Sequence, residues 1–306
     1  MKTMFYNLMY VDLEERRYLS GKTYGEEERL DLYVKGCCVL DKSLKINSFF
    51  AGVNIVTNNK ILIINSLQRI GYTDINVVEI PFSLNVPKGI PFYSAHFKID
   101  VFKYFASRPS DEYSILLDSD VICLHDFNGE FYSIIDNHVP MVYYLNTYGG
   151  EKKLKDVCKI DTDIKWMPWV GGEFIGGDAI FFSSLYREIM LFKEEYWNVV
   201  SNGLFHVGDE MLTSIAIARL RKKNICPVDA KWFGVIHRYW SEIETKRLFD
   251  YDCPLMHIPG DKIFEHKINL NVISIEDLLK GYKLYCIMKR TKGVFKNIVG
   301  CLNHCK

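Results

Sequence analysis

The fold class is decided by the stretch Tyr113-Ser-Ile-Leu-Leu-Asp118-Ser119-Asp120-Val121, an apolar run followed at once by two carboxylates one residue apart. The apolar run predicts a buried strand, and ligand sites of open α/β sheets lie beyond the carboxyl ends of such strands. Side chains at positions i and i+2 can converge there on one hard divalent cation. Oxygen ligands favour Mg²⁺ or Mn²⁺ over zinc. The alternative is an ordinary polar turn after a strand.

Around this stretch the sequence alternates between strand and helix patterns. The first half predicts strands over residues 53–57, 75–80 and 113–117, separated by helices over 60–70 and 94–106. The second half predicts strands over 140–145 and 173–183, a loop or short helix over 152–166, and helices over 184–199 and 209–221. The alternation favours an α/β fold with a Rossmann-like, mostly parallel central sheet flanked by helices. We place the charge-rich residues 11–35 on the surface around this core.

Composition narrows the functional classes. The chain has 306 residues, 48% of them hydrophobic, and a formal net charge of zero, which argues against nucleic acid as a partner. Its nine cysteines include no CxxC pair, so neither a zinc ribbon nor a disulfide framework is expected. Residues 1–10 lack the apolar run of a signal peptide, and no stretch of about 18 apolar residues occurs. We therefore expect a cytoplasmic protein, either free or peripheral on the inner face of the membrane.

The last 26 residues differ from the rest of the chain. Residues 281–306 contain six Lys or Arg and no Asp or Glu. Apolar residues recur among them at near-helical spacing: Leu284, Met288, Phe295, Ile298 and Leu302. We therefore divide the chain into a domain over 1–280 and a basic, amphipathic, helical tail over 281–306. Such a tail can bind an anionic membrane surface; the alternative is a terminal helix packed on the domain, and Gly293 weakens a continuous helix.

Residues 92–123 resemble the stretch before and through the Asp-x-Asp motif of GT-A glycosyltransferases, with Ser119 as the middle residue. The resemblance implies that Asp118 and Asp120 bind the metal and the diphosphate of a nucleotide-sugar donor. Several of these families carry a basic residue in the helix before the motif. Lys98 has that position and is implied to contact donor phosphates; otherwise it is a solvated helix residue. The end of the first predicted strand, where GT-A folds bind the nucleotide base, carries Asn54, Thr57 and Asn58.

A glycine-containing run, Trp169-Val-Gly-Gly-Glu173-Phe-Ile-Gly176-Gly177-Asp178, is similar to the acceptor-side strand of GT-A enzymes. Glycines before or within a strand let a ligand approach the backbone closely. The resemblance implies such an approach at Gly176 and Gly177, with Glu173 and Asp178 as further candidates for contacts to sugar hydroxyls. Packing or turn geometry would explain the same glycines.

Two later motifs complete the resemblance. The run His206-Val-Gly-Asp209-Glu210-Met-Leu resembles the acidic motif that opens a helix in GT-A enzymes, which implies catalytic roles for Asp209 and Glu210; helix capping is the alternative. The run His257-Ile-Pro-Gly260-Asp-Lys262 resembles the late His-x-x-Gly-x-x-Lys motif of retaining families related to glycogenin and lipopolysaccharide galactosyltransferases. That motif implies His257 as a metal ligand and Gly260 and Lys262 as donor-binding residues, although Lys262 comes one residue early.

The resemblance implies a transferase that uses a UDP-sugar, with Mn²⁺ or Mg²⁺ held by Asp118, Asp120 and His257, and a glycan or lipid-linked acceptor, as in surface polysaccharide synthesis. One rival is a haloacid-dehalogenase-type phosphatase, whose nucleophile motif fits Asp118-Ser-Asp120-Val. Its later acidic motif is only half matched, because position 213 is Thr. Another rival is a non-catalytic carbohydrate-binding protein of the same fold. No GxGxxG follows the first predicted strand, so a Rossmann dehydrogenase is poorly supported.

Overall fold

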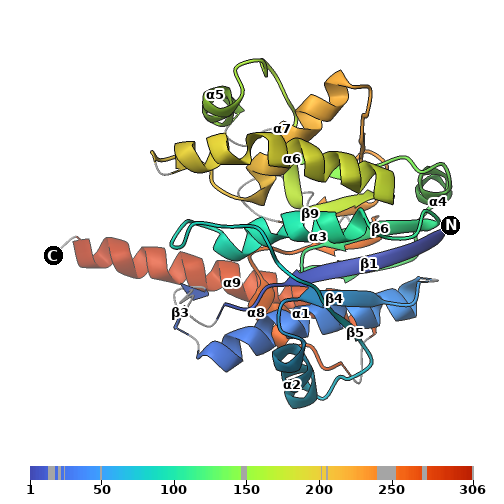
Figure 1. The fold of residues 1–306 in the computed structure, drawn as a ribbon. Helices are drawn as coiled ribbons and strands as arrows, with labels where there is room; N and C mark the ends of the chain where they lie inside the picture. The colour runs from blue at the N-terminus through green and yellow to red at the C-terminus, as the bar shows by residue number, and fades with distance from the viewer. Residues whose placement is uncertain are drawn as a thin grey trace.

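The centre of the protein is a seven-stranded sheet in the order β10-β8-β9-β6-β1-β4-β5, seen in a computed structural model (Figure 1). The structure describes residues 1–12, 18–19, 22–23, 25–48, 50–145, 150–200, 202–204, 206–239, 253–270 and 274–304. Four strands run parallel: β1 (Lys2–Met9), β4 (Val53–Thr57), β5 (Asn76–Glu79) and β6 (Glu112–Leu117). Beyond β6 the direction changes, since β9 (Trp169–Gly177) is antiparallel to both β6 and β8 (Met141–Leu145), and β10 (Val228–Asp229) pairs with β8.

Helices cover both faces of this sheet (Figure 1). On one side lie α1 (Glu26–Asn47) and α2 (Lys60–Ile70); on the other lie the short helix η1 (Tyr93–Phe97), α3 (Lys98–Phe105) and α6 (Ala179–Val200). The remaining helices before the C-terminal region are α4 (Gly129–Asp136), α5 (Gly150–Ile160) and α7 (Asp209–Lys222), and a short β2–β3 pair joins Tyr18–Leu19 to Lys22–Thr23. Because both faces are covered, all six residues of β6 are buried, which explains its continuous apolar run. The expected α/β fold is confirmed.

A second, three-stranded sheet stands beside the end of β6. Its strands are β7 (Val121–Cys123), β11 (Ile236–Arg238) and β12 (Leu255–His257), in the order β11-β12-β7. The antiparallel register of β12 and β7 sets His257 opposite Val121, and the amide of Ile258 donates to the carbonyl of Asp120 at 2.9 Å. The fold thus brings residues more than a hundred positions apart to the turn between β6 and β7.

Two sequence predictions were wrong in their bounds. The apolar residues after Gly177 were assigned to a strand, but they form the first turn of α6, because the Asp178 carboxylate accepts a hydrogen bond from the amide of Phe181 at 2.8 Å and caps the helix. Residues 11–35 were placed on the surface, but from Glu26 onward they belong to α1, and Leu32 and Val34 of this helix are buried in the core. Residues 13–17, 20–21 and 24 of that segment lie outside the described part of the chain.

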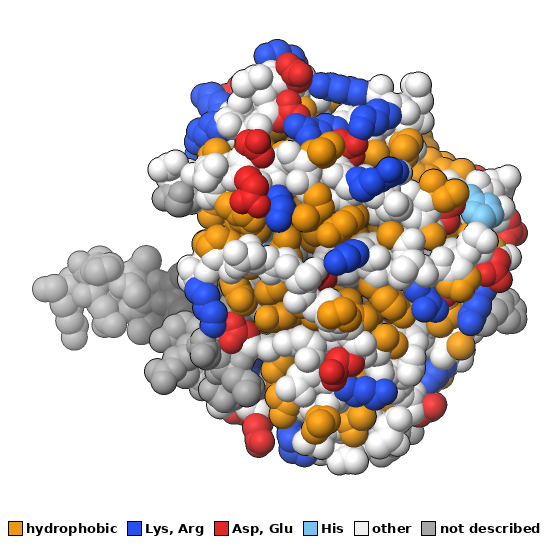
Figure 2. All heavy atoms as spheres, viewed as in Figure 1, with side chains coloured by type: hydrophobic (Ala, Val, Ile, Leu, Met, Phe, Trp, Pro, Cys, Tyr) orange, Lys and Arg blue, Asp and Glu red, His pale blue; other side chains and the backbone are white. Residues whose placement is uncertain are grey.

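The C-terminal region begins with α8 (Lys262–His266) and ends with α9 (Ile275–His304), which extends past the rest of the fold (Figure 1). The proposed boundary at residue 280 falls inside α9. The first turns of this helix are attached to the domain, since the hydroxyl of Tyr282 and the ammonium of Lys289 both donate to Asp261, at 3.0 and 2.6 Å. Among the described residues, no helix combines the length and apolar character of a membrane span. Figure 2 shows basic and acidic side chains mixed over the described part of one face.

Candidate functional site

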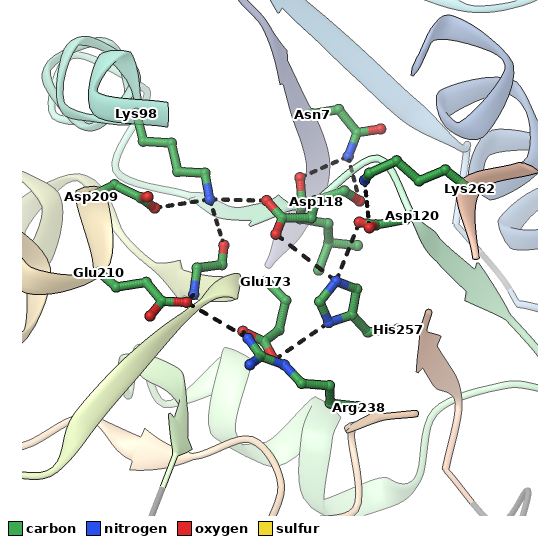
Figure 3. A network of polar contacts seen from close by, with 12 residues as sticks. Asn7, Lys98, Asp118, Asp120, Glu173, Asp209, Glu210, Arg238, His257 and Lys262 are labelled. Atoms are coloured by element: carbon green, nitrogen blue, oxygen red, sulfur yellow. Dashed lines mark hydrogen bonds and ion pairs between the residues drawn. The ribbon is translucent and has the colours of Figure 1, made fainter. Parts of the chain in front are cut away.

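Asp118, Asp120 and His257 form a compact cluster of metal-ligating side chains. One ligand atom from each lies within 4.8 Å of the other two. The Nε2 atom of His257 is 3.2 Å from Asp120 Oδ1 and 4.0 Å from Asp118 Oδ2 (Figure 3). The two carboxylates come from the turn that leaves β6, and the imidazole comes from the end of β12, so the carboxyl end of the buried strand is indeed where the side chains converge.

The chemistry of this cluster fits a divalent cation. Asp120 and His257 are each 2% exposed, yet Asp120 Oδ1 and both ring nitrogens of His257 make no hydrogen bond of good geometry among the described residues; the ring nitrogens have only ion-pair contacts, of 3.2 Å to Asp120 and 3.4 Å to Glu173. Buried polar atoms without partners are rare in folded proteins and need a reason. Two carboxylate oxygens with one imidazole nitrogen make a suitable donor set for Mn²⁺ or Mg²⁺. These residues could therefore hold either ion, through the carboxylate oxygens of Asp118 and Asp120 and the Nε2 atom of His257.

Two buried charged residues, Glu173 and Arg238, lie on the side of the His257 ring that faces away from Asp120. The Nδ1 atom of His257 is 3.4 Å from Glu173 Oε1, and Arg238 binds the Glu173 carboxylate through Nε and a terminal nitrogen, both at 2.6 Å (Figure 3). Burial would lower the pKa of His257, but the carboxylates of Asp120 and Glu173 outweigh it and raise this pKa to about 9. Glu173 is fully buried, so the prediction that it contacts sugar hydroxyls was wrong.

Two lysines approach the cluster from opposite sides. The ammonium of Lys98 lies 2.9 Å from Asp118 and 2.9 Å from Asp209, and donates to the carbonyl of Gly172 at 2.8 Å. Lys98 is only 8% exposed, so it is not the solvated helix residue that was the alternative. Lys262, the first residue of α8, forms an ion pair with Asp120 despite the shortened spacing of its motif. Burial would lower both lysine pKa values, but the neighbouring carboxylates raise them.

The adjacent acids at the start of α7 point in different directions (Figure 3). Asp209 faces the cluster and pairs with Lys98. Glu210 is directed at Gly172 and Arg238: its two oxygens accept hydrogen bonds from the indole of Trp169 at 2.7 Å and the amide of Gly172 at 3.2 Å, and Oε1 lies 3.7 Å from the Arg238 guanidinium. Neither side chain caps α7, whose N-cap residue makes no side-chain capping bond. Both acids nevertheless lie in the first turn of α7, where the helix dipole favours carboxylates.

The glycine that lies against the site is Gly172, which was not singled out from the sequence. A Cβ atom placed on it would come within 2.8 Å of Lys98 Nζ and 3.0 Å of Asp209 Oδ2. Gly176 and Gly177 instead pair with Ile115 and Ser114, toward the opposite end of β6 from Asp118, where added Cβ atoms would meet neighbouring aromatic rings. The structure does not bring these two glycines to the site.

The residues expected to bind the nucleotide base are not gathered in one place. Asn54 lies near the start of β4, where its side chain bonds to the Phe5 carbonyl and to Asn76. Thr57 is buried at the end of that strand, and the side chain of Asn58 bonds to both backbone groups of Val11. Only the last two therefore lie at the carboxyl end of the sheet, and Asn58 serves to hold the chain that leaves β1.

Other backbone contacts shape the Asp-x-Asp turn. The side-chain amide of Asn7, on β1, donates to the carbonyls of Leu117 at 2.8 Å and Asp118 at 3.2 Å. Gly36 lets α1 pass close to the carbonyl of Ser119, since a Cβ atom at this glycine would overlap it. The carbonyl of Gly260 accepts a hydrogen bond from Lys289 at 3.3 Å. The contacts of Asn7 and Gly36 with the Asp-x-Asp turn, and of Arg238 with Glu173, could not be predicted from the sequence, because in each case the partner lies far away along the chain.

The fold of this chain is shared with solved structures. A parallel sheet that changes direction after β6, with carboxylates at that point and a small second sheet beside it, is an architecture also found among glycosyltransferases. Solved structures confirm this fold: 189 chains match, including the apo form of mouse xyloside xylosyltransferase 1. That match has a TM-score of 0.52 and 11% sequence identity, and covers 85% of this chain and 98% of the mouse chain. No protein-family model and no curated protein sequence matches.

Proposed function

We propose that this protein is a metal-dependent glycosyltransferase that moves a sugar from a nucleotide-diphosphate sugar, a UDP-sugar, to a glycan or lipid-linked acceptor. The observation that carries the proposal is the cluster of Asp118, Asp120 and His257 at the carboxyl end of β6, with a lysine on either side. The fold shared with a xylosyltransferase supports it. The same shared fold disfavours the phosphatase alternative.

The side chains suit departure of a diphosphate. In the transfer, the bond from the anomeric carbon to the acceptor oxygen forms as the bond to the diphosphate oxygen breaks. A bound Mn²⁺ or Mg²⁺ would supply Lewis-acid neutralisation of the leaving group. Lys98 and Lys262 bring two further positive charges to the same place, where charge develops in the transition state.

The positions of the two acids of α7 support retention of the anomeric configuration. Asp209 lies on the side of Lys98, and therefore of the donor, while both oxygens of Glu210 already accept hydrogen bonds from the protein. We propose same-face attack, in which the acceptor proton passes to the leaving diphosphate oxygen and Asp209 stands below the sugar. Inversion would instead require Glu210 to take that proton.

A screen of nucleotide-sugar hydrolysis tests the function. The purified protein should release nucleoside diphosphate from a UDP-sugar in Mn²⁺ and lose this activity in EDTA. Turnover of p-nitrophenyl phosphate with Mg²⁺, and none of any nucleotide sugar, would favour the phosphatase. Absence of metal-dependent nucleotide binding would favour a non-catalytic carbohydrate-binding protein.

We also propose that the acceptor belongs to a surface polysaccharide or similar glycan and that α9 binds an anionic membrane surface, with the protein peripheral on the inner face. Exposed apolar side chains in the described part of α9 support the second point: Leu284, Ile287 and Met288. They belong to a segment that holds six bases and no acids.

A further inference from the structure

The buried pair of Glu173 and Arg238 makes no contact with the donor-binding lysines and needs an explanation beyond the 3.7 Å contact of Arg238 with Glu210. Glu173, on β9, is fully buried, and Arg238, on β11, is 6% exposed. Their two parallel contacts of 2.6 Å fix the carboxylate in one orientation. Removing two charges from water is costly, and a well-packed apolar pair would often be as stable. A structural role alone therefore explains the pair poorly.

The fixed carboxylate is directed at a metal-ligating residue. Its Oε1 atom lies 3.4 Å from Nδ1 of His257, and Nε2 on the opposite side of that ring is the atom near Asp118 and Asp120 (Figure 3). Histidines that bind metals commonly direct the other ring nitrogen at a carboxylate, which sets both the ring orientation and the tautomer. The pairing of β12 with β7 fixes the backbone position of His257, but it leaves the imidazole ring free to rotate about its side-chain bonds.

We propose that Glu173, held in place by Arg238, is a positioning residue for His257. It orients the imidazole so that Nε2 faces Asp118 and Asp120 and the ring proton stays on Nδ1. Arg238 acts one step further back, since it keeps the carboxylate ionised and stationary where no water reaches. The proposal rests on the metal site of the proposed function, but metal binding can be measured without any nucleotide or acceptor.

The chain offers a matched control. Arg108 also binds a buried glutamate through two contacts, to the carboxylate of Glu112 at 3.0 and 2.8 Å, and Glu112 is 2% exposed. Glu112 begins β6, whereas Asp118 follows the end of that strand. The two pairs are alike in chemistry and in the burial of the glutamate, although Arg108 is more exposed than Arg238, and only Glu173 contacts His257.

The experiment is a calorimetric titration with Mn²⁺ alone. We expect Glu173→Gln to weaken Mn²⁺ binding about 10- to 100-fold, the usual effect of losing such an outer carboxylate. Glu112→Gln should leave the affinity unchanged, although it too strips an arginine of its partner. Unchanged affinity in Glu173→Gln, or an equal loss in both variants, would overturn the positioning role.

A second variant covers the case in which Glu173→Gln does not fold, because it leaves Arg238 as an unpaired buried charge. The double variant Glu173→Leu/Arg238→Met removes both charges together, a change that buried ion pairs often tolerate. It should show the same loss of Mn²⁺ affinity, and wild-type affinity in the folded double variant would refute the proposal. If the unaltered protein itself binds no Mn²⁺, the metal site fails, and the proposed function fails with it.

Discussion

At the scale of single residues, Asp120 should be the most sensitive position of the site. Its buried carboxylate faces both His257 and Lys262. We expect Asp120→Asn to lower metal-dependent turnover at least about 10²-fold, the scale of losing several kcal/mol of leaving-group stabilisation. Turnover with Mn²⁺, measured beside thermal unfolding, checks this; normal turnover in a folded Asp120→Asn protein would remove the metal assignment. His257→Ala should weaken Mn²⁺ binding as well.

The raised pKa of His257 predicts how the metal-free protein responds to pH. Its pKa is about 9 in the folded chain and 6.5 by reference, so the folded state holds a proton that the unfolded state releases between these values. The stabilisation is complete below about pH 6.5 and is lost as pH rises to 9, by up to about 3 kcal/mol. Urea unfolding in EDTA should show this loss in the wild type but not in His257→Gln. Parallel pH curves for the two proteins would contradict the prediction.

At the scale of secondary-structure elements, the sequence predicted the strands and helices that depend on local patterns of apolar residues. The apolar run before Asp118 identified β6, and the periodic segments over 60–70 and 209–221 identified α2 and α7 almost to the residue. The central strand β1 was missed, because its run KTMFYNLM includes Asn7, which resembles a loop residue until its bonds to the carbonyl of Leu117 are seen. The metal ligands could be proposed from motifs, whereas the pairing of Glu173 with Arg238 depends on contacts between distant strands.

Because β9 lies close to Lys98 of α3, we expect one methyl group added at Gly172 to have a strong effect on turnover. Gly172→Ala would place a Cβ atom within 2.8 Å of Lys98 Nζ and so displace the ammonium that joins Asp118 to Asp209. Misplacement by about 1 Å can cost roughly 10²-fold in rate, so we expect turnover to fall by about 10- to 100-fold in a folded protein. Gly129→Ala is the matched control, because an added Cβ atom there meets no atom within 4 Å. Equal turnover in both variants would show that Lys98 can move without consequence.

The start of α7 predicts the stereochemistry of the product. We expect Asp209→Asn to lower turnover at least about 10²-fold, because it removes the negative charge that would stabilise the positive charge developing on the sugar. Glu210→Gln should also lower turnover, because it disturbs the contacts that hold Trp169 and Gly172 in place. We also expect an α-linked product from a UDP-α-sugar, since Asp209 rather than Glu210 pairs with Lys98 beside the metal cluster. NMR of the anomeric proton of the product measures this directly. A β-linked product would assign the base role to Glu210.

At the scale of the whole molecule, α9 predicts membrane binding. Leu284, Ile287 and Met288 are each more than half exposed. The side chains of Phe295, Ile298 and Leu302 lie outside the described residues. We expect replacement of the three exposed residues by serine to reduce sedimentation with anionic liposomes, to which each base of the segment adds about 1 kcal/mol. The control replaces three apolar residues on other helices that are somewhat more exposed than those of α9: Ile61, Ile180 and Leu191.

Equal sedimentation of the two triple variants, or no binding by the unaltered protein, would contradict the prediction. Point variants are preferable to a chain that stops at residue 280, because such a chain would also lose Tyr282 and Lys289, which hold Asp261.

The ion pairs of Lys98 and Lys262 imply an order of events. In the metal-free protein both ammonium groups serve as counter-ions of the carboxylates, one to Asp118 and Asp209 and the other to Asp120. A phosphate arriving first would find these positive charges already engaged and the aspartates repelling it. For the proposed transferase, a cation at Asp118 and Asp120 would neutralise the carboxylates that hold Lys262 and, in part, Lys98, and so leave these lysines available to the diphosphate. We therefore expect the metal to bind before the donor.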